Sequence, residues 1–361
     1  MIPFNEMLDR MVNENGSDLF LTAKTYPYMK VGGKFFKLSE EMLENSDTEK
    51  IAVELMDEKQ RSEFYRTNEM NLAFTLAEKG RFRTNIFMQR GSISIVIRLV
   101  KFDIPDFQTL GLPKALSELI MEDRGLILVT GATGSGKSTT LASMINYRNE
   151  NRDGHIITLE DPIEFIHFHK KSVINQREVG LDTDSYSVGL KNVLRQAPDV
   201  ILIGEIRDIE TMESAMSYAE TGHLVLSTLH STNAKQTLER IVQFYPDGTE
   251  KTVLQQLSNI LIGIISQRLI PRKDGNGRVA AVEVMKSSAR IRELIYKGEL
   301  GEIIPTIEIS ELDGMCSFDQ ALLKYYHTGV IDLNLAKQYS DNPSDLALKA
   351  AGVTTGSVKI E

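Results

Sequence analysis

The residue types and spacing best suited to chemistry occur in one glycine-rich stretch. Residues 131–138 read Gly-Ala-Thr-Gly-Ser-Gly-Lys-Ser and match the phosphate-binding pattern G-x-x-x-x-G-K-[ST] at every fixed position. Glycines permit the tight turn that brings backbone N–H groups around a β-phosphate. We expect Lys137 to reach the β- and γ-phosphates and the Ser138 hydroxyl to bind Mg²⁺. The stretch therefore predicts a site for a nucleoside triphosphate such as ATP.

The flanking residues would place this stretch between a strand and a helix. The apolar run 126–129 suits a strand buried on both faces, and residues 139–144 can continue as a helix. The alternative is a glycine-rich turn without a ligand, which the complete motif in this context disfavours. The predicted nucleotide-binding residues here are Gly131, Thr133, Gly134, Ser135, Gly136, Lys137, Ser138 and Thr139.

Carboxylates follow two further predicted strands. The strand 155–159 runs into an acidic stretch that contains Glu160 and Glu164, and the strand 200–203 runs into Gly204 and Glu205. Ligands of open α/β sheets collect beyond the carboxyl ends of the strands. Glu160, Glu164 and Glu205 are therefore candidates for orienting the attacking water and for holding Mg²⁺, with Glu205 as a metal ligand directly or through water. Gly204 stands where an Asp often precedes such a carboxylate.

Histidines and arginines leave alternatives open. His223 and His230 flank a predicted strand at 224–229; each is either a structural residue or a sensor of the γ-phosphate. Arginines at 195, 207 and 240 either pair with the acids or reach a neighbouring subunit, and pairing is favoured.

The first hundred residues predict a small α+β domain. Short alternating runs indicate strands, among them 71–76, 81–89 and 93–99, with one helix over 47–66. Arg81, Arg83 and Arg98 lie in the later strands. Either they are solvated and pair with acids such as Glu69 and Glu78, or they reach the nucleotide phosphates.

Length and composition bound the rest. A chain of 361 residues can hold two domains: we expect residues 1–100 as the first, a linker at 101–113, an ATPase domain at 114–350 that is mostly helical from 250, and a mobile tail at 351–361. The net charge of -9 argues against a protein that binds nucleic acid. The lone Cys316 supplies no disulfide or multi-cysteine metal site. Without a signal peptide or an apolar run of about 20 residues, we expect a cytoplasmic protein.

The ordered set of motifs at 131–138, 157–164, 199–205 and 221–230 resembles the Walker A, Asp box, Walker B and His box of secretion-superfamily ATPases. In particular, it is similar to type IV pilus retraction ATPases of the PilT/PilU family. The resemblance extends over nearly the whole chain, from Gly16-Ser17-Asp18-Leu19 to residues 317–322.

This resemblance implies a fold, a reaction and partners. It implies a PAS-like N-terminal domain, a RecA-like P-loop ATPase domain and a helical C-terminal extension. The family forms homohexameric rings beneath an inner-membrane pilus platform protein and hydrolyses ATP to drive pilus retraction and twitching motility. The resemblance makes Glu164 the leading catalytic glutamate and Glu205 the Walker B carboxylate, with His223 and His230 in the His box. It also makes Arg81, Arg83 and Arg98 nucleotide-binding residues.

One departure concerns a C-terminal helix. The family's PilT branch carries A-I-R-N-L-I-R-E where this chain reads Arg-Ile-Arg-Glu-Leu-Ile-Tyr-Lys at 290–297, which resembles the PilU branch more. We therefore expect a motor for pilus retraction, acting either alone or as an accessory motor that works with a PilT-like partner. Alternatives are a pilus extension or type II secretion ATPase, which the missing tetracysteine element weakens, and a nucleotide-regulated subunit with little turnover. A DNA-translocating enzyme is disfavoured by the net charge.

Overall fold

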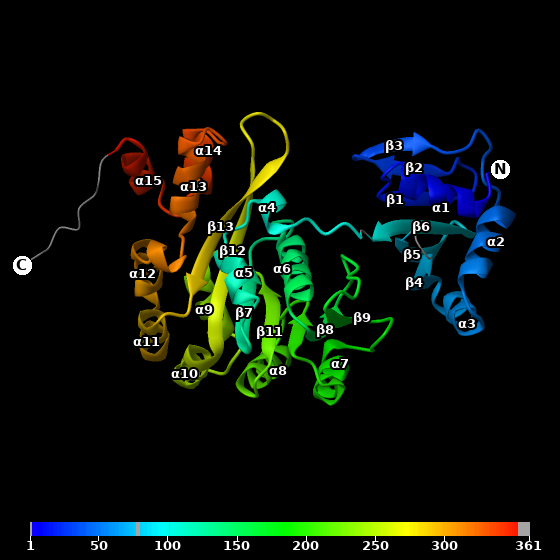
Figure 1. Ribbon diagram of the computed structural model, residues 1–361. Helices are drawn as coiled ribbons and strands as arrows, with labels where there is room; N and C mark the ends of the chain where they lie inside the picture. Colours follow the sequence, from blue (N-terminus) through cyan, green and yellow to red (C-terminus); the bar gives the residue numbers. More distant parts are fainter. Residues whose placement is uncertain (1, 77–79, 101, 353–361) are drawn as a thin grey trace, which may run out of the picture. The chain divides into compact units, whose positions relative to one another are not determined.

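The computed structural model describes residues 2–76, 80–100 and 102–352 (Figure 1). The chain divides into two compact units, one of Met1–Asp103 with Ile163–Ile166 and one of Ile104–Pro162 with His167–Glu361. Glu78 and residues 353–361 of the predicted tail lie outside the described residues.

The first unit is built on an antiparallel sheet of six strands. Their order is β3-β2-β1-β6-β5-β4, with bounds β1 (Asp18–Thr22), β2 (Tyr28–Val31), β3 (Lys34–Lys37), β4 (Glu69–Leu76), β5 (Gly80–Gln89) and β6 (Ser92–Val100). Burial alternates along β5, where Phe82 and Ile86 are buried and Arg81 and Arg83 face the other side. This period of two buries one face of the sheet. Apolar residues of α1 (Phe4–Asn13), α2 (Asn45–Leu55) and α3 (Glu58–Thr67) join the same core.

The helix predicted at 47–66 is two helices. Asp57 interrupts it because its side chain accepts a hydrogen bond from the Gln60 backbone N–H, while the Gln60 side chain accepts one from the Asp57 N–H. Such a capping box begins a new helix and satisfies its first amide groups. The predicted single helix was wrong at this point, and α1 was not predicted at all.

The second unit is built on a sheet of seven strands in the order β13-β12-β7-β11-β10-β8-β9. The strands are β7 (Gly125–Thr130), β8 (Gly154–Glu160), β9 (Ser172–Glu178), β10 (Val200–Ile203), β11 (Leu224–Leu229), β12 (Leu261–Pro271) and β13 (Arg278–Lys286). All neighbours are parallel except the β12–β13 hairpin. Every residue of β7, β10 and β11 is buried, as expected of parallel strands covered on both faces.

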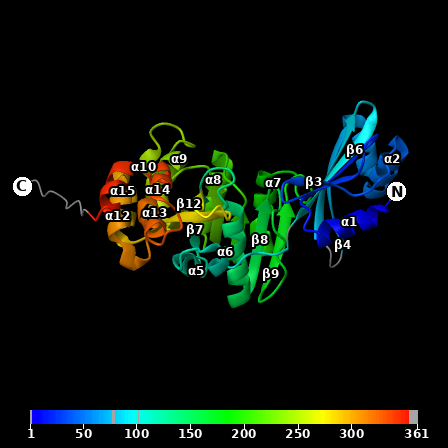
Figure 2. The same cartoon turned by 90° about the horizontal axis from the view of Figure 1, so that it is seen from above.

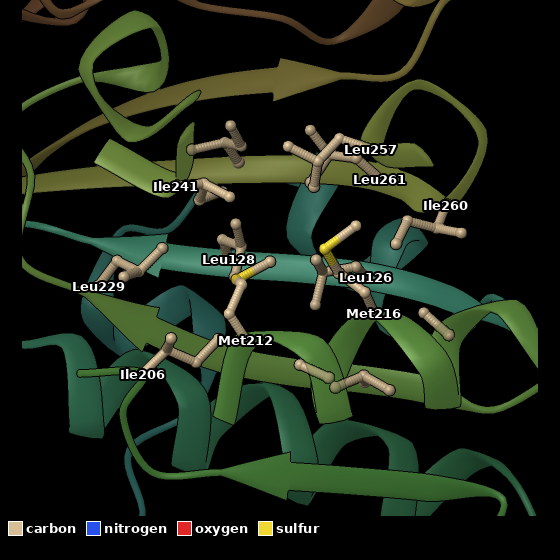
Figure 3. Close-up of a cluster of buried hydrophobic side chains, with 14 of the residues drawn as sticks. Leu126, Leu128, Ile206, Met212, Met216, Leu229, Ile241, Leu257, Ile260 and Leu261 are labelled. Carbon is tan, nitrogen blue, oxygen red and sulfur yellow. The ribbon is translucent and has the colours of Figure 1, made fainter. Parts of the chain in front are cut away.

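Helices cover both faces of this sheet. They are α5 (Ala115–Leu119), α6 (Lys137–Asn151), α7 (Tyr186–Val193), α8 (Ile209–Glu220), α9 (Ala234–Val242) and α10 (Glu250–Ile260). Leu126 and Leu128 of β7 pack with Met212 and Met216 of α8 and with Leu257 of α10 in one cluster, shown in Figure 3. The alternate β7 residues point to the opposite face, into a cluster with α5 and α6. Figure 2 shows α6 beside β8 and β9.

The C-terminal part differs from the expectation. Residues 261–286 were predicted within a mostly helical region, but they form the β12–β13 hairpin, and β9 was also not predicted. The apolar run of β12 is too short to show a helical or a strand period by itself. Helices then follow as α11 (Ala289–Lys297), α12 (Ile303–Ile309), α13 (Phe318–His327), α14 (Leu333–Tyr339) and α15 (Pro343–Ala350), of which the last three pack together (Figures 1 and 2).

Two further observations complete the fold. The segment predicted as a linker contains the short helix α4 (Phe107–Leu110), which Asp106 caps by accepting from the Thr109 N–H. Among the described residues, no helix is both long and apolar enough to cross a membrane.

Candidate nucleotide-binding site

The glycine-rich loop lies between β7 and α6, as its strand and helix context predicts. Gly131, Gly134 and Gly136 have φ angles of 146°, 76° and 92°, a region that side chains rarely adopt. A Cβ at Gly131 would also lie 2.5 Å from the Gln267 carbonyl oxygen and from Ser135 Oγ. The backbone conformation therefore favours glycine at all three positions, and the close approach of β12 leaves no room for a side chain at Gly131 as well.

The first turn of α6 faces this loop. Gly136 is the N-cap of α6, and no side chain caps the helix there. The N-terminus of a helix, with its amide groups and positive dipole end, is suited to a phosphate. Ser135 Oγ is buried and has no hydrogen-bond partner within residues 2–76, 80–100 and 102–352. A phosphate oxygen would accept from this hydroxyl, so the loop fits an anionic ligand.

Lys137 folds back onto the loop. Its Nζ donates to the carbonyl oxygens of Gly131, at 2.8 Å, and of Ala132, at 3.0 Å. Burial lowers the pKa of Lys137, and the charge of Glu205 opposes that shift. The ammonium group is thus held next to the loop, within electrostatic reach of Glu205.

The carboxyl ends of four neighbouring strands bring the other candidates to one edge. The loop follows β7, His230 follows β11, Glu205 follows β10, and Glu160 ends β8. One Glu205 oxygen pairs with Arg207, and the other lies 3.4 Å from His230 Nε2. Arg207 therefore pairs with an acid, as the sequence favoured. Glu160 accepts from Thr158 Oγ1 at 2.7 Å.

His223 lies at the other end of the sheet. It precedes β11, which has six residues, whereas His230 follows it, so at about 3.3 Å a residue roughly 20 Å of strand separates the two. Its Nδ1 lies 3.1 Å from the Tyr218 carbonyl oxygen. Within one chain the structure does not bring His223 to the phosphate loop, which corrects its grouping with His230.

The remaining candidates lie elsewhere. Glu164 is exposed in the segment after β8, within Ile163–Ile166, which is grouped with the first unit. In the first unit, Arg83 and Arg98 are direct cross-strand neighbours, an unfavourable pairing of like charges. Arg98 Nε donates to Asp18 Oδ1 at 2.8 Å, which offsets part of that repulsion. The acidic partner of Arg98 is therefore Asp18. Arg81 lies on the same face of β5 as Arg83.

Two residues of this edge were not predicted. Gln267 of β12 accepts a hydrogen bond from Thr140 Oγ1 of α6 at 2.7 Å, and its Nε2 would lie 2.9 Å from a Cβ at Gly136. Tyr186, at the start of α7, has its hydroxyl next to Gly204. Burial raises the pKa of Tyr186, and Asp161, Glu205 and Glu160 raise it further. Neither residue belongs to a motif, so no sequence signal marked them.

Comparison with known proteins assigns the family. A family model described as "Type II/IV secretion system protein" matches residues 4–303. The chain belongs to this family. It is 46% identical to the type IV pilus ATPase PilU of Pseudomonas aeruginosa, covering 96% of this chain and 90% of that protein. It is 38% identical to PilT of the same organism, covering 94% of this chain and 98% of that protein.

A solved structure of the secretion family agrees with the fold. The crystal structure of the pilus retraction motor PilT with bound ADP superposes with a TM-score of 0.89 at 42% identity, covering 96% of this chain and 99% of that one. The predicted fold class, a parallel-sheet P-loop domain with a smaller α+β domain, is confirmed. The predicted resemblance to the PilT/PilU family is confirmed as well.

Proposed function

We propose that this chain is an ATP-hydrolysing motor that drives type IV pilus retraction and twitching motility. The observation that carries the proposal is the placement of Lys137, Glu205 and His230 at one sheet edge, in a chain that matches a pilus ATPase over 96% of its length. A phosphate loop alone would fit kinases and GTPases equally. The family relatives named as pilus ATPases favour mechanical work over phosphoryl transfer to a substrate.

Mg²⁺ fits the oxygen ligands at this edge. Ser138 stands in the first turn of α6, and Glu205, whose side chain is 14% exposed, follows β10 at the same sheet edge. Hard oxygen ligands of this kind suit Mg²⁺. When bound with ATP, the metal would neutralise charge on the phosphate oxygens.

The chain's own residues divide the remaining work. We propose that the 131–139 loop cradles the phosphates and that Lys137 leaves the loop carbonyls to bind the β- and γ-phosphates. Glu205 and Glu160 would hold metal-bound waters, Glu164 would orient the attacking water, and His230 would respond to the γ-phosphate through Glu205. Arg81, Arg83 and Arg98 are proposed as phosphate-binding residues of the first unit. The roles of the loop, Glu205, Glu160 and His230 are supported by their positions at one sheet edge. Those of Glu164, Arg81, Arg83 and Arg98 rest on the family resemblance.

Assembly and location belong to the same proposal. We infer a homohexameric ring in the cytoplasm, peripheral at the inner membrane, where a pilus platform protein would anchor it. Nucleotide should promote the ring. Native mass spectrometry with and without Mg–ATP tests this, and a protein that stays monomeric at physiological concentration with ATP would contradict it.

Phosphate release by the purified chain tests hydrolysis. We expect turnover in the wild type, no measurable turnover in Lys137→Ala, and a large loss in Glu205→Gln and Glu164→Gln. Exposed Lys191→Ala serves as a control, since Lys191 pairs with the surface residue Glu210 on α8. If wild type and Lys137→Ala release phosphate equally slowly while the wild type still binds ATP, the chain is a nucleotide-regulated subunit instead.

A second candidate is an accessory motor that retracts pili only with another motor. The higher identity to PilU than to PilT favours it, as does the sequence of α11, which differs from the PilT pattern at 290–297. Deleting the gene in a piliated strain separates the functions: surplus unretracted pili support a retraction motor, and loss of pili would support an extension motor. Unchanged pili at low load with failed retraction at high load would identify the accessory role.

A further inference from the structure

Tyr186 lies at the nucleotide-binding edge, but the roles proposed above leave it unused. It is the first residue of α7, and its ring packs against the core cluster of Figure 3. Its hydroxyl oxygen is buried and has no hydrogen-bond partner in the part of the chain that the structure describes. A buried hydroxyl without a hydrogen-bond partner lowers the stability of the folded chain, so its presence indicates a role other than folding.

The hydroxyl points at Gly204, the residue immediately before Glu205. A Cβ at position 204 would lie 2.7 Å from Tyr186 Oη and 3.2 Å from Glu160 Cα. The φ angle of Gly204 is not in the left-handed region, so backbone conformation does not demand a glycine here. A glycine is needed because the Tyr186 phenol and β8 approach too closely to leave room for a side chain. The same fact explains why this chain has no Asp before Glu205.

The surroundings of the phenol are acidic. Asp161, Glu205 and Glu160 all act on it electrostatically, and Arg207 is the cation that opposes them. Negative neighbours and burial both disfavour a phenolate. The group therefore stays a hydroxyl, which can donate one hydrogen bond towards this edge.

We propose that Tyr186 is a positioning residue for ATP hydrolysis, whose hydroxyl gains its hydrogen-bond partner at the Glu160–Glu205 edge when Mg²⁺ and the triphosphate bind. The inference rests on the proposed function. Tyr186 acts through the carboxylates and the water they hold, and Gly204 leaves the space that lets its hydroxyl reach them. The Tyr186 hydroxyl gains this hydrogen bond only when the γ-phosphate group is in place, so binding of the diphosphate does not depend on the hydroxyl.

The test compares two nucleotide probes on Tyr186→Phe, which keeps the ring and removes only the hydroxyl. We expect the affinity for Mg–ADP to stay within about twofold of the wild type. We expect the affinity for Mg–ADP–aluminium fluoride, a mimic of the reacting phosphate, to fall about ten- to hundred-fold, as for loss of a hydrogen bond to a charged group. Without nucleotide, the melting temperature should be unchanged or higher, because the removed hydroxyl had no partner.

Tyr218→Phe is the matched control. The Tyr218 hydroxyl is buried and donates to the Leu190 carbonyl oxygen at 2.7 Å, so its removal should lower the melting temperature and leave both affinities unchanged. Gly204→Ala tests the contact itself. This substitution should lower the melting temperature less in the Tyr186→Phe variant than in the wild type. An equal loss in both backgrounds would show that the hydroxyl does not set the space at Gly204 and would overturn the proposal.

Two results on the probes would also overturn it. The proposal is wrong if Tyr186→Phe binds Mg–ADP–aluminium fluoride as tightly as the wild type does. It is also wrong if the variant loses affinity for Mg–ADP to the same extent, because that result would indicate a general distortion of the site. Failure of the proposed function would look different, because then the wild type would still bind Mg–ADP but would release phosphate no faster than Lys137→Ala. The affinities need no turnover, so an accessory motor that is inactive alone can still be tested.

Discussion

At the scale of single residues, the second unit contains a buried carboxyl whose pKa is raised, that of Glu283. Glu283 of β13 is fully buried, and its Oε1 accepts from the Ala234 backbone N–H at 2.7 Å and from Ser266 Oγ at 3.1 Å. Burial raises the pKa of Glu283 to about 7, against the hydrogen bonds and Arg268, which lower it. This carboxyl at the start of α9 therefore changes charge near neutral pH.

The sign of the pH effect follows from this shift. The pKa of Glu283 is about 7 in the folded chain against an ordinary value of 4.5, so its contribution to stability is complete below pH 4.5 and is lost as the pH rises through 7. Glu283→Gln lacks this titration. Relative to that variant, the free energy of unfolding of the wild type should fall by on the order of 3 kcal/mol between pH 4.5 and 7.5. Urea titrations across that range measure it, and parallel pH curves would contradict it.

At the scale of elements, β12 forms one side of the phosphate loop. Gln267 bonds to Thr140 of α6, and its backbone and side chain leave no room for a Cβ at Gly131 or Gly136. The strand that the sequence did not predict thus helps to shape the site that the sequence predicted best. The reason is that β12 pairs with β7 in parallel, so its residues lie beside the loop that follows β7.

Removal of the Gln267 side chain should weaken nucleotide binding. Gln267→Ala leaves the buried Thr140 hydroxyl without its partner, a loss of about 1 to 3 kcal/mol, and frees the loop on one side. We expect about a tenfold weaker affinity for Mg–ADP and a lower melting temperature. Exposed Gln256→Ala on α10 is the control. Fluorescent-nucleotide binding decides, and an unchanged affinity at a lowered melting temperature would limit Gln267 to a structural role.

At the scale of the whole molecule, one arginine joins segments far apart in the sequence. Arg268 of β12 donates to the Tyr339 carbonyl oxygen at 2.5 Å, to Asp341 Oδ1 at 2.6 Å and to the Thr232 carbonyl oxygen at 3.3 Å. Its guanidinium lies 3.8 Å from the centre of the Phe318 ring. Thr232 follows His230 by two residues, so Arg268 connects the loop after β11 with the C-terminal helices.

A lysine cannot replace this connection. It lacks the planar fork that donates to several oxygens while stacking on a ring. Arg268→Lys should therefore speed amide hydrogen exchange in α14 and α15 and in the loop after His230, while Arg272→Lys, whose partner is the nearby Asp274, should not. Faster exchange limited to the residues around Arg268 would show that the stability of the C-terminal helices does not depend on this arginine.

Much of this chain could be predicted from local patterns. The phosphate loop, the strand before it and the helix after it are neighbours in the sequence, and the glycines that the turn needs are visible as letters. The PilT/PilU family resemblance followed from motifs in a fixed order and was confirmed. The break at Asp57 and the β12–β13 hairpin were missed, because a cap depends on side-chain geometry and a short apolar run fits either a strand or a buried helix.

The sequence by itself determined the kind of ligand and the family, because both depend on residues a few positions apart. The tertiary structure alone decided which distant residues share the site. It separated His223 from His230, since a strand carries its two ends to opposite edges of a sheet. It brought Tyr186 against Gly204 and Gln267 against the loop, since strand order and helix packing set those contacts. Such pairings depend on how the whole chain folds, and no spacing in the sequence records them.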